Sequence, residues 1–350
     1  MTTRHSSATF LLLALAGCTS AHGLPEPSIA PSPPSALGAC LAEGGALVEL
    51  GVVDNNDQHD HGSLLRFELS PAGLGAAAGE DGTLKFWTLD ATLVGVADPG
   101  VLTYGAELGG APITDLAFDG ETAIAGDVRG LVQGLESAGT ASVLSGTDPD
   151  VPITAVAFEP TSGWLAHAQG GPAAPDVVPL IVKSLDGETR WNLTATIDDI
   201  RDLAFDGTGR LYVAGADDGF AVIEVRDADD PTQLANRISL DEGAHVVELA
   251  RSDDGAIFVA ATEHGLFALE ESGPRRIRAS EAALRSVALT PAGDTIVSLD
   301  ETGTLVVSGA DGRALGQTSL PGAIGVRTAA TGDRLVVGSV DAHLRVLGCR

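Results

Sequence analysis

Lysine, aromatic residues and long apolar runs are scarce in this chain of 350 residues, and each shortage excludes a class of protein. Lysine occurs only at Lys85 and Lys183, and 20 basic residues stand against 48 acidic ones, which gives a formal net charge of −28. Such a charge repels phosphate backbones and excludes nucleic acid as a partner. No segment has the ~20 consecutive apolar residues of a transmembrane helix. The nucleophile elbow, the phosphate-binding loop and the HExxH motif are also missing, so no catalytic residue is assigned.

The composition that remains is that of a folded protein with a core of small and branched aliphatic residues. Hydrophobic residues make up 44% of the chain and aromatic residues only 4%, and there are 44 glycines. A chain this rich in apolar residues can bury a sizeable core, which excludes intrinsic disorder as its general state.

The N-terminus has the organisation of a targeting segment. Arg4 and His5 give a weakly basic start, a short apolar stretch follows at 10–16, and the run ends in "LAGC", Leu15 to Cys18. This ending resembles the lipobox of bacterial lipoprotein signal peptides. The resemblance implies that residues 1–17 are removed and that Cys18 carries the lipid, including a palmitate chain. An ordinary cleaved signal peptide that happens to end near a cysteine is the alternative.

Residues 18–42 are expected to form a tether, because the segment after Cys18 is rich in Pro, Ser and Ala and lacks periodicity. Thr19 follows the lipidated position, where an Asp is associated with retention in the inner membrane. We therefore expect a protein of the bacterial cell envelope, held at the outer membrane through its lipid anchor only.

Beyond residue 42 the sequence repeats one unit. A unit begins with an apolar residue, followed by a second three positions later and a third two positions after that, and then by a turn, although Arg251 takes the third place in the fifth unit. The starting residues fall 38 to 49 residues apart, and they are Leu64, Ile113, Ile153, Ile200, Val246 and Leu284, with a more divergent seventh copy near Ala323. That period is typical of the four-stranded blades of a β-propeller, and no sustained helical pattern interrupts it.

A second signal recurs within each unit, namely a tight acidic or glycine turn followed by an alternating strand. Its clearest copy is "GEDGTLKFWTLD", Gly79 to Asp90. On these residues the chain resembles the WD-repeat β-propeller family, whose units end in a similar strand. The resemblance covers about 300 residues as a pattern, but only Asp81 to Trp87 match closely. The family's inter-blade His and repeated Trp-Asp ending are mostly absent.

The two ends of the repeat array predict how the ring closes. The seventh unit stops at Arg350 after its third strand, whereas the strand-like segment 46–54 precedes the first unit without partners of its own. Pairing the two completes the last blade and removes an exposed sheet edge. The predicted fold is therefore all-β, a seven-bladed propeller of four-stranded blades over residues 43–350, closed by an N-terminal strand.

Cys40 and Cys349 are the two cysteines left once Cys18 is lipidated. In an oxidising compartment such a pair favours a disulfide. The predicted closure places Cys349 at the end of the last strand and Cys40 shortly before the strand that pairs with it. We predict a Cys40–Cys349 disulfide across the seam, with two free thiols as the alternative.

Two groups of polar residues are candidate binding sites. The loop "DNNDQHDHG" could ligate a divalent cation through Asp57, His59, Asp60 and His61, or could simply be a solvated loop. Acidic residues also recur at the turn between the second and third strands of the units, where they could form a ring that attracts a basic partner, or could serve only the chemistry of tight turns. These residues are Glu80, Asp81, Asp127, Asp217, Asp218, Glu263, Asp300, Glu301 and Asp341.

Two functional hypotheses follow. The first is a monomeric, non-catalytic scaffold without cofactor that binds a protein or peptide, preferably a basic one, in the cell envelope. The second is an enzyme, a metal-dependent hydrolase or lactonase with carboxylates in the central channel. Acidic side chains that converge on one ion-sized site in the channel would favour the enzyme, whereas acidic side chains spread around the rim would favour the scaffold.

The lipobox generates the first testable prediction. Replacing the thiol in a Cys18→Ser chain removes the acylation site, and one or two acyl chains supply the membrane affinity of such a protein. We expect the variant to move from the membrane to the soluble fraction in cell fractionation. A variant that stays with the membrane would contradict the lipoprotein interpretation.

Overall fold

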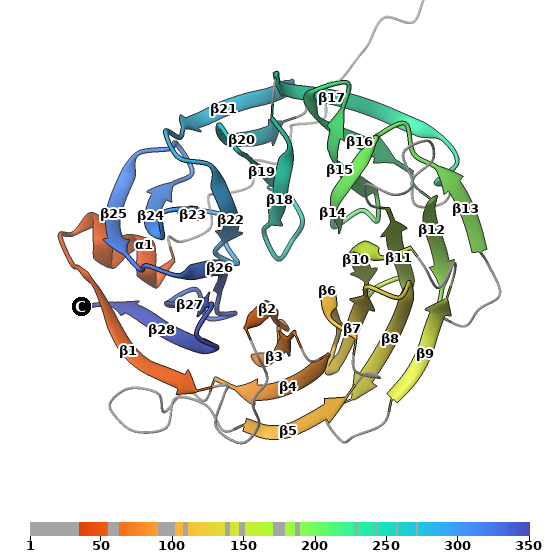
Figure 1. The fold of residues 1–350 in the computed structure, drawn as a ribbon. Coiled ribbons are helices and arrows are strands. Elements are labelled where there is room, and N and C mark those ends of the chain that lie inside the picture. The colour runs from red at the N-terminus through yellow and green to blue at the C-terminus, as the bar shows by residue number, and fades with distance from the viewer. Residues whose placement is uncertain are drawn as a thin grey trace, which may run out of the picture. The chain divides into compact units, whose positions relative to one another are not determined.

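The computed structural model describes residues 35–54, 63–80, 82–89, 102–107, 111–136, 141–146, 151–170, 179–185, 190–227, 230–242, 244–256, 258–270 and 272–350. These residues form a ring of seven antiparallel sheets with four strands each (Figure 1). The prediction of an all-β, seven-bladed propeller is confirmed.

In each blade the first strand is innermost and the fourth lies at the outer edge (Figure 1). Blade 1 contains β2 (Leu64–Leu69), β3 (Leu74–Gly79), β4 (Thr83–Thr88) and β5 (Leu102–Glu107); blade 2 contains β6 (Ile113–Asp119), β7 (Thr122–Asp127), β8 (Leu131–Glu136) and β9 (Ala141–Gly146); blade 3 contains β10 (Ile153–Glu159), β11 (Trp164–Gln169), β12 (Pro179–Ser184) and β13 (Arg190–Thr194). Blade 4 contains β14 (Asp199–Phe205), β15 (Leu211–Asp217), β16 (Phe220–Arg226) and β17 (Leu234–Glu242); blade 5 contains β18 (Val246–Arg251), β19 (Phe258–Thr262), β20 (Gly265–Glu270) and β21 (Gly273–Ala279). Blade 6 contains β22 (Leu284–Leu289), β23 (Thr295–Asp300), β24 (Thr304–Gly309) and β25 (Ala314–Ser319); blade 7 contains β26 (Ala323–Thr328), β27 (Arg334–Ser339), β28 (His343–Cys349) and, as its outer strand, β1 (Leu47–Asp54).

The hydrophobic core is divided among the junctions between blades. The described residues form seven buried clusters, and each cluster joins side chains of two neighbouring blades. At the junction of blades 1 and 2, for example, Leu84 and Phe86 pack against Ile113 and Leu116. A four-stranded sheet has two faces to cover, so each blade depends on both of its neighbours.

Small residues in the second strands allow this close packing. Ala76, Ala77 and Ala78 of β3 are fully buried. The motif that introduced the repeat lies here as well, because Trp87 is fully buried at the junction of blades 7 and 1. A Cβ on Gly75 would lie 2.1 Å from the Trp87 ring, so only glycine fits beneath it.

The ring closes as the sequence predicts. Strand β1 pairs antiparallel with β28 from Leu47 opposite Cys349 to Asp54 opposite His343, with one bulge between Glu49 and Gly51. The Ala46 and Arg350 backbones add a reciprocal pair of hydrogen bonds beyond the strand end. In Figure 1 the first and last described segments lie side by side at this seam.

The Cys40–Cys349 disulfide is also present, with the two Cα atoms 6.1 Å apart. Cys40 lies on the short helix α1 (Ala36–Ala42), which the sequence analysis did not predict. Ser35 caps the helix by accepting a hydrogen bond from the Gly38 N–H, and Leu37 and Leu41 are buried in the cluster of blades 6 and 7. Residues 35–42, which the sequence places in the tether, therefore pack on the propeller.

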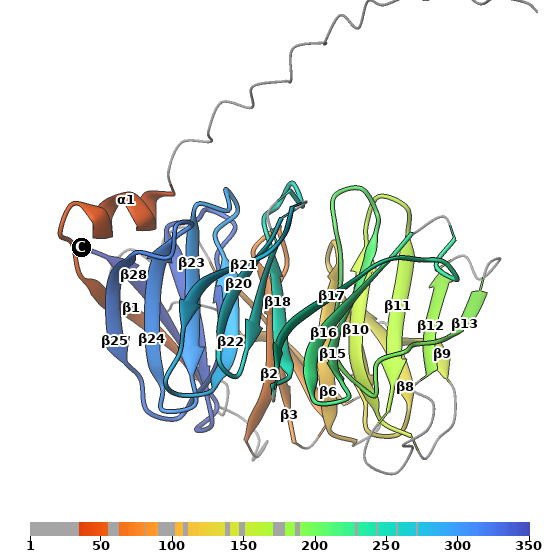
Figure 2. The same cartoon turned by 90° about the horizontal axis from the view of Figure 1, so that it is seen from above.

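The two ends of the ring differ, and we name them by their turns. The first-turn face carries the turns between first and second strands. Helix α1 lies on this face (Figure 2). The Ser35 N–H donates to Asp294 Oδ2 (2.6 Å) and the Leu37 N–H to the Gly332 carbonyl, and both acceptors belong to first turns. The second-turn face carries the turns between second and third strands together with the connections into the innermost strands. Backbone hydrogen bonds such as Glu301 N–H to Ala283 O join these two sets of loops. Among the described helices, none has the length and apolarity needed to cross a membrane.

The disulfide generates a prediction about stability. It encloses a loop with a sequence separation of 309 residues, so chain-entropy arguments set an upper limit of about 5 to 6 kcal/mol on its contribution to the free energy of unfolding. We expect the Cys40→Ser/Cys349→Ser chain to remain folded through β1, but to unfold at lower temperature and denaturant concentration than the oxidised protein. The Cys18→Ser chain is the control for cysteine removal. Equal melting curves with and without reductant would contradict the prediction.

Candidate functional site

A channel runs through the centre of the ring and forms a cavity of about 1060 Å³. The seven innermost strands line it (Figure 1). Its two openings lie on the two faces, with Pro71, Pro160 and Pro291 near the first-turn face and Glu263 and Glu301 near the second-turn face.

Every innermost strand carries a β-bulge at the same position of the repeat. A register shift follows the buried residue that opens each repeat, and it occurs in all seven blades. A β-bulge of this kind re-aims side chains and bends the strand. The residues directly after the shift are Arg66, Asp115, Ala155, Asp202, Glu248, Ser286 and Gly325.

Four of these residues accept a backbone hydrogen bond from the next blade. The Val156 N–H donates to Asp115 Oδ2 at 2.8 Å, and the Leu249 N–H donates to Asp202 Oδ2 at 2.6 Å. Likewise, the Val287 N–H donates to a Glu248 oxygen (2.6 Å) and the Val326 N–H to the Ser286 hydroxyl (3.1 Å). The acceptor side chain of one blade thus satisfies a backbone donor that the bulge frees in the next. We call these four contacts the inter-blade clamps.

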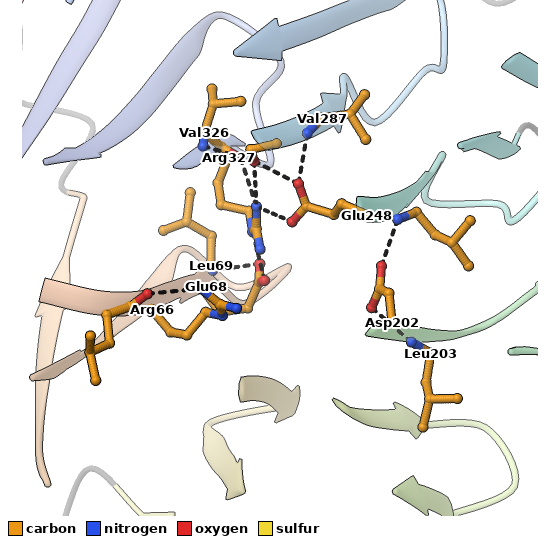
Figure 3. Close-up of polar contacts among 12 residues, drawn as sticks. Arg66, Glu68, Leu69, Asp202, Leu203, Glu248, Val287, Val326 and Arg327 are labelled. Carbon is orange, nitrogen blue, oxygen red and sulfur yellow. Dashed lines mark hydrogen bonds and ion pairs between the residues drawn. The ribbon is translucent and has the colours of Figure 1, made fainter. Parts of the chain in front are cut away.

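Arg327 on β26 reaches across the channel wall to two further blades (Figure 3). Its Nε lies 2.6 Å from Glu68 Oε2 on blade 1, and its Nη1 lies 2.8 Å from Glu248 Oε1 on blade 5. Burial alone would lower the pKa of Arg327, but the carboxylates of Glu248 and Glu68 outweigh it and raise the pKa, so the guanidinium stays charged. Arg327 therefore ties three blades together and neutralises part of the channel's negative charge.

Two channel carboxylates have strongly shifted proton affinity. Burial raises the pKa of Asp115 to about 6, although Arg66 opposes the shift. Burial also raises the pKa of Asp202 well above its ordinary value, and the nearby charges of Asp115 and Glu248 add to the effect. Both carboxyl groups keep their backbone donors, so their altered pKa values accompany a structural role.

Among the residues that the structure describes, the channel carboxylates do not converge on an ion-sized site. Within the described ranges, the only group of three potential ligands with all ligand atoms within 4.8 Å of one another is Asp198, Asp217 and Asp218, on the second-turn face of blade 4. Asp217 is already ion-paired with Arg237, and the Asp218 N–H donates to Asp198 Oδ2. The acidic cluster thus lies at the rim rather than in the channel.

Three of the predicted acidic turn residues act as turn caps. The buried Asp127 accepts hydrogen bonds from the Arg129 and Leu131 N–H groups and pairs with the Arg129 side chain. Asp300 accepts from the Thr302 and Thr304 N–H groups, and Asp341 from the His343 N–H. Their carboxylates serve the tight turns.

Other predicted acidic residues remain directed toward solvent on the second-turn face. Glu80, Asp218 and Glu301 are exposed and Glu263 is half-buried. Glu263 and Glu301 line the channel opening. Asp217 is half-buried beside them and is neutralised by Arg237. The structure therefore divides the predicted ring into turn caps and a smaller set of outward-facing carboxylates.

Several candidate residues lie outside the described residues, namely Cys18, Asp81 and the loop residues Asp57, His59, Asp60 and His61. The rings of Trp164 and Trp191 contact each other in a tilted arrangement, with centroids 4.8 Å apart and an interplanar angle of 46°. Both side chains pack against the cluster of blades 3 and 4.

Sequence reasoning missed the clamp residues and Arg327. A signal was available, because Asp115, Asp202, Glu248 and Ser286 occupy one position of the repeat, two residues after its opening apolar residue. The apolar positions alone define the repeat in the sequence analysis above, and they do not reveal this polar position.

Neither a family model nor a curated protein matches the chain.

The raised pKa of Asp202 generates a prediction with a defined sign. Because the folded-state pKa lies above the ordinary value of 3.8, the associated stability is fully present below that value and is lost as the pH rises through the folded pKa. Asp202→Asn cannot ionise and keeps one acceptor oxygen, for the Leu249 N–H, although its amide nitrogen replaces the oxygen that accepts from the Leu203 N–H. We expect it to raise the free energy of unfolding near neutral pH, and to lose this advantage below about pH 4.

Denaturant titrations across this pH range test the expectation. Asp202→Ala is the matched control, because it removes the acceptor and should destabilise the fold at every pH. An Asp202→Asn chain that is less stable than the wild type near neutral pH would contradict the prediction.

Proposed function

We propose that the chain is a lipid-anchored β-propeller of the bacterial cell envelope that acts as a non-catalytic scaffold for a protein partner. The observation that carries the proposal is the use of the channel's polar groups. Asp115, Asp202 and Glu248 accept backbone hydrogen bonds from neighbouring blades, and Arg327 is paired with Glu68 and Glu248. Side chains whose polar atoms already bond to neighbouring blades stabilise the ring. Their polar atoms are not free to bind or activate a substrate.

The surface supports the same proposal. Outward-facing carboxylates on the second-turn face, including Glu80, Asp218 and Glu301, give a basic partner an electrostatic target. The lipobox-like "LAGC" supports an envelope location for this surface. The motif at Asp81 to Trp87 supports a distant relationship to WD-repeat propellers, a family in which binding surfaces are a common use of the fold.

An enzyme is the second candidate, and one observation favours it. Asp115 and Asp202 have raised pKa values inside a cavity of about 1060 Å³, and perturbed carboxyl groups in cavities mark many active sites. A hydrolase or lactonase at this position would use the two carboxyl groups as acid and base.

One experiment separates the two candidates. The purified chain is immobilised and exposed to detergent-solubilised envelope proteins, and the same preparation is assayed for hydrolysis of lactones with and without added divalent metal ions. We expect a defined protein to be retained and released by salt, and we expect no turnover. Turnover that disappears in Asp115→Asn or Asp202→Asn chains, without a retained protein, would overturn the scaffold proposal.

A further inference from the structure

Large apolar side chains are exposed at few places in the described part of the chain, and most of these places share one face. The five such residues are Val128, Val143, Phe220, Leu234 and Val340. Val128 and Val340 lie in the turns between second and third strands, and Phe220 directly follows such a turn. Three of the five therefore lie on the second-turn face.

Phe220 is the most unusual of them. It opens β16 and is 41% exposed, although it is a large aromatic residue. The residues that open the third strands of other blades, Leu131, Thr304 and His343, are half-buried, and Gly265 is buried. Phe220 belongs to none of the buried clusters of the described residues, and exposed aromatic side chains are common anchors in protein interfaces.

Acidic residues lie in and next to the hairpin that carries Phe220. Phe220 lies opposite Asp217 in the β15–β16 hairpin, whose turn contains Asp218. Asp217, Asp218 and Asp198 form the close acidic group, but Arg237 neutralises only Asp217. Within the described ranges, Asp198 and Asp218 have no ion-pair partner and both are exposed. We call Phe220, Asp198 and Asp218 the blade-4 patch.

We propose that the blade-4 patch binds a basic peptide segment of the partner, with an apolar side chain packed on Phe220 and lysine or arginine side chains facing Asp198 and Asp218. The inference rests on the proposed scaffold function and assigns its contact surface. Charge complementarity selects the basic partner, and the exposed ring requires that the segment also carry an apolar residue.

The patch and helix α1 lie on opposite faces of the ring. Helix α1 lies on the first-turn face (Figure 2). Asp218 belongs to the β15–β16 turn and Phe220 directly follows it, so both lie on the second-turn face. A bound metal ion is a poorer occupant, because Arg237 already pairs with one of the three carboxylates.

The test uses a short fluorescein-labelled peptide of alternating lysine and leucine, with lysine–serine and glutamate–leucine peptides as comparisons. Fluorescence anisotropy is measured with the wild-type chain, with Phe220→Ser and with Asp198→Asn/Asp218→Asn. The Asn residues keep the acceptor for the Asp218 N–H and tolerate its positive φ of 47°, so the backbone is preserved. Matched controls on the first-turn face are Leu234→Ser in the same blade and Glu121→Gln/Asp311→Asn.

We expect the lysine–leucine peptide to bind best. Phe220→Ser should weaken it by about tenfold, and the double Asn variant should weaken it several-fold, chiefly through slower association and a smaller salt dependence. The control variants should bind as the wild type does. Equal weakening by the controls, or no weakening by either patch variant in chains that melt normally, would overturn the assignment.

Two further measurements distinguish a wrong patch, a wrong scaffold function and self-association of the chain. If the patch is wrong but the scaffold function is right, the immobilised Phe220→Ser chain still retains the same envelope protein as the wild type. If the scaffold function itself is wrong, the wild-type chain retains none. Concentration-dependent dimerisation that disappears in Phe220→Ser would assign the patch to a second copy of the chain and overturn the proposal.

Discussion

Each blade of the ring is apolar on both broad faces, so no blade can shield its own core. The seven buried clusters lie between blades, and the burial of one sheet is complete only when both neighbours are in place. The hydrophobic effect therefore acts on the ring as a whole and requires that it be closed. The seam between β1 and β28 is where the chain meets this requirement by strand pairing, by the packing of α1 and by the disulfide.

The inner wall of the ring satisfies a polar requirement at the same junctions. A bulge interrupts each innermost strand, and in four blades the side chain that follows it accepts a hydrogen bond from the next blade. Blade 7 has Gly325 at this position and cannot form the contact. There the Arg327–Glu68 ion pair crosses from blade 7 to blade 1 instead. Charged groups in the channel thus align the blades at the small radius where apolar contacts are few.

The sequence predicted the fold because the features that define it are local and repeated. The apolar positions led by Leu64, Ile113 and Ile153 recur with the period of a blade. Turn residues such as Asp127, Asp300 and Asp341 cap the same hairpin in three copies. The closing strand and the Cys40–Cys349 pair followed from the unequal ends of the array.

Features that depend on contacts between distant parts of the chain could not be predicted from local, repeated sequence patterns. Helix α1 has seven residues, which is too short to be stable without the contacts that bury Leu37 and Leu41. The clamp carboxylates contact backbone groups some 40 residues away in the chain, as Asp115 does at Val156. The exposure of Phe220 is likewise a property of the assembled face, since aromatic residues at strand starts are usually covered.

The pairing of β1 with β28 has a consequence for the order in which the protein can be made. Strand β1 is the first of the described strands to be synthesised, yet its partner β28 is the last. Cys40 likewise cannot form its disulfide until Cys349 has been synthesised. During synthesis, blade 1 can associate with blade 2 while β1 still has an unpaired edge. A chain that stops before β28 cannot complete the ring, so its exposed strand edge and free thiol distinguish unfinished molecules from finished ones.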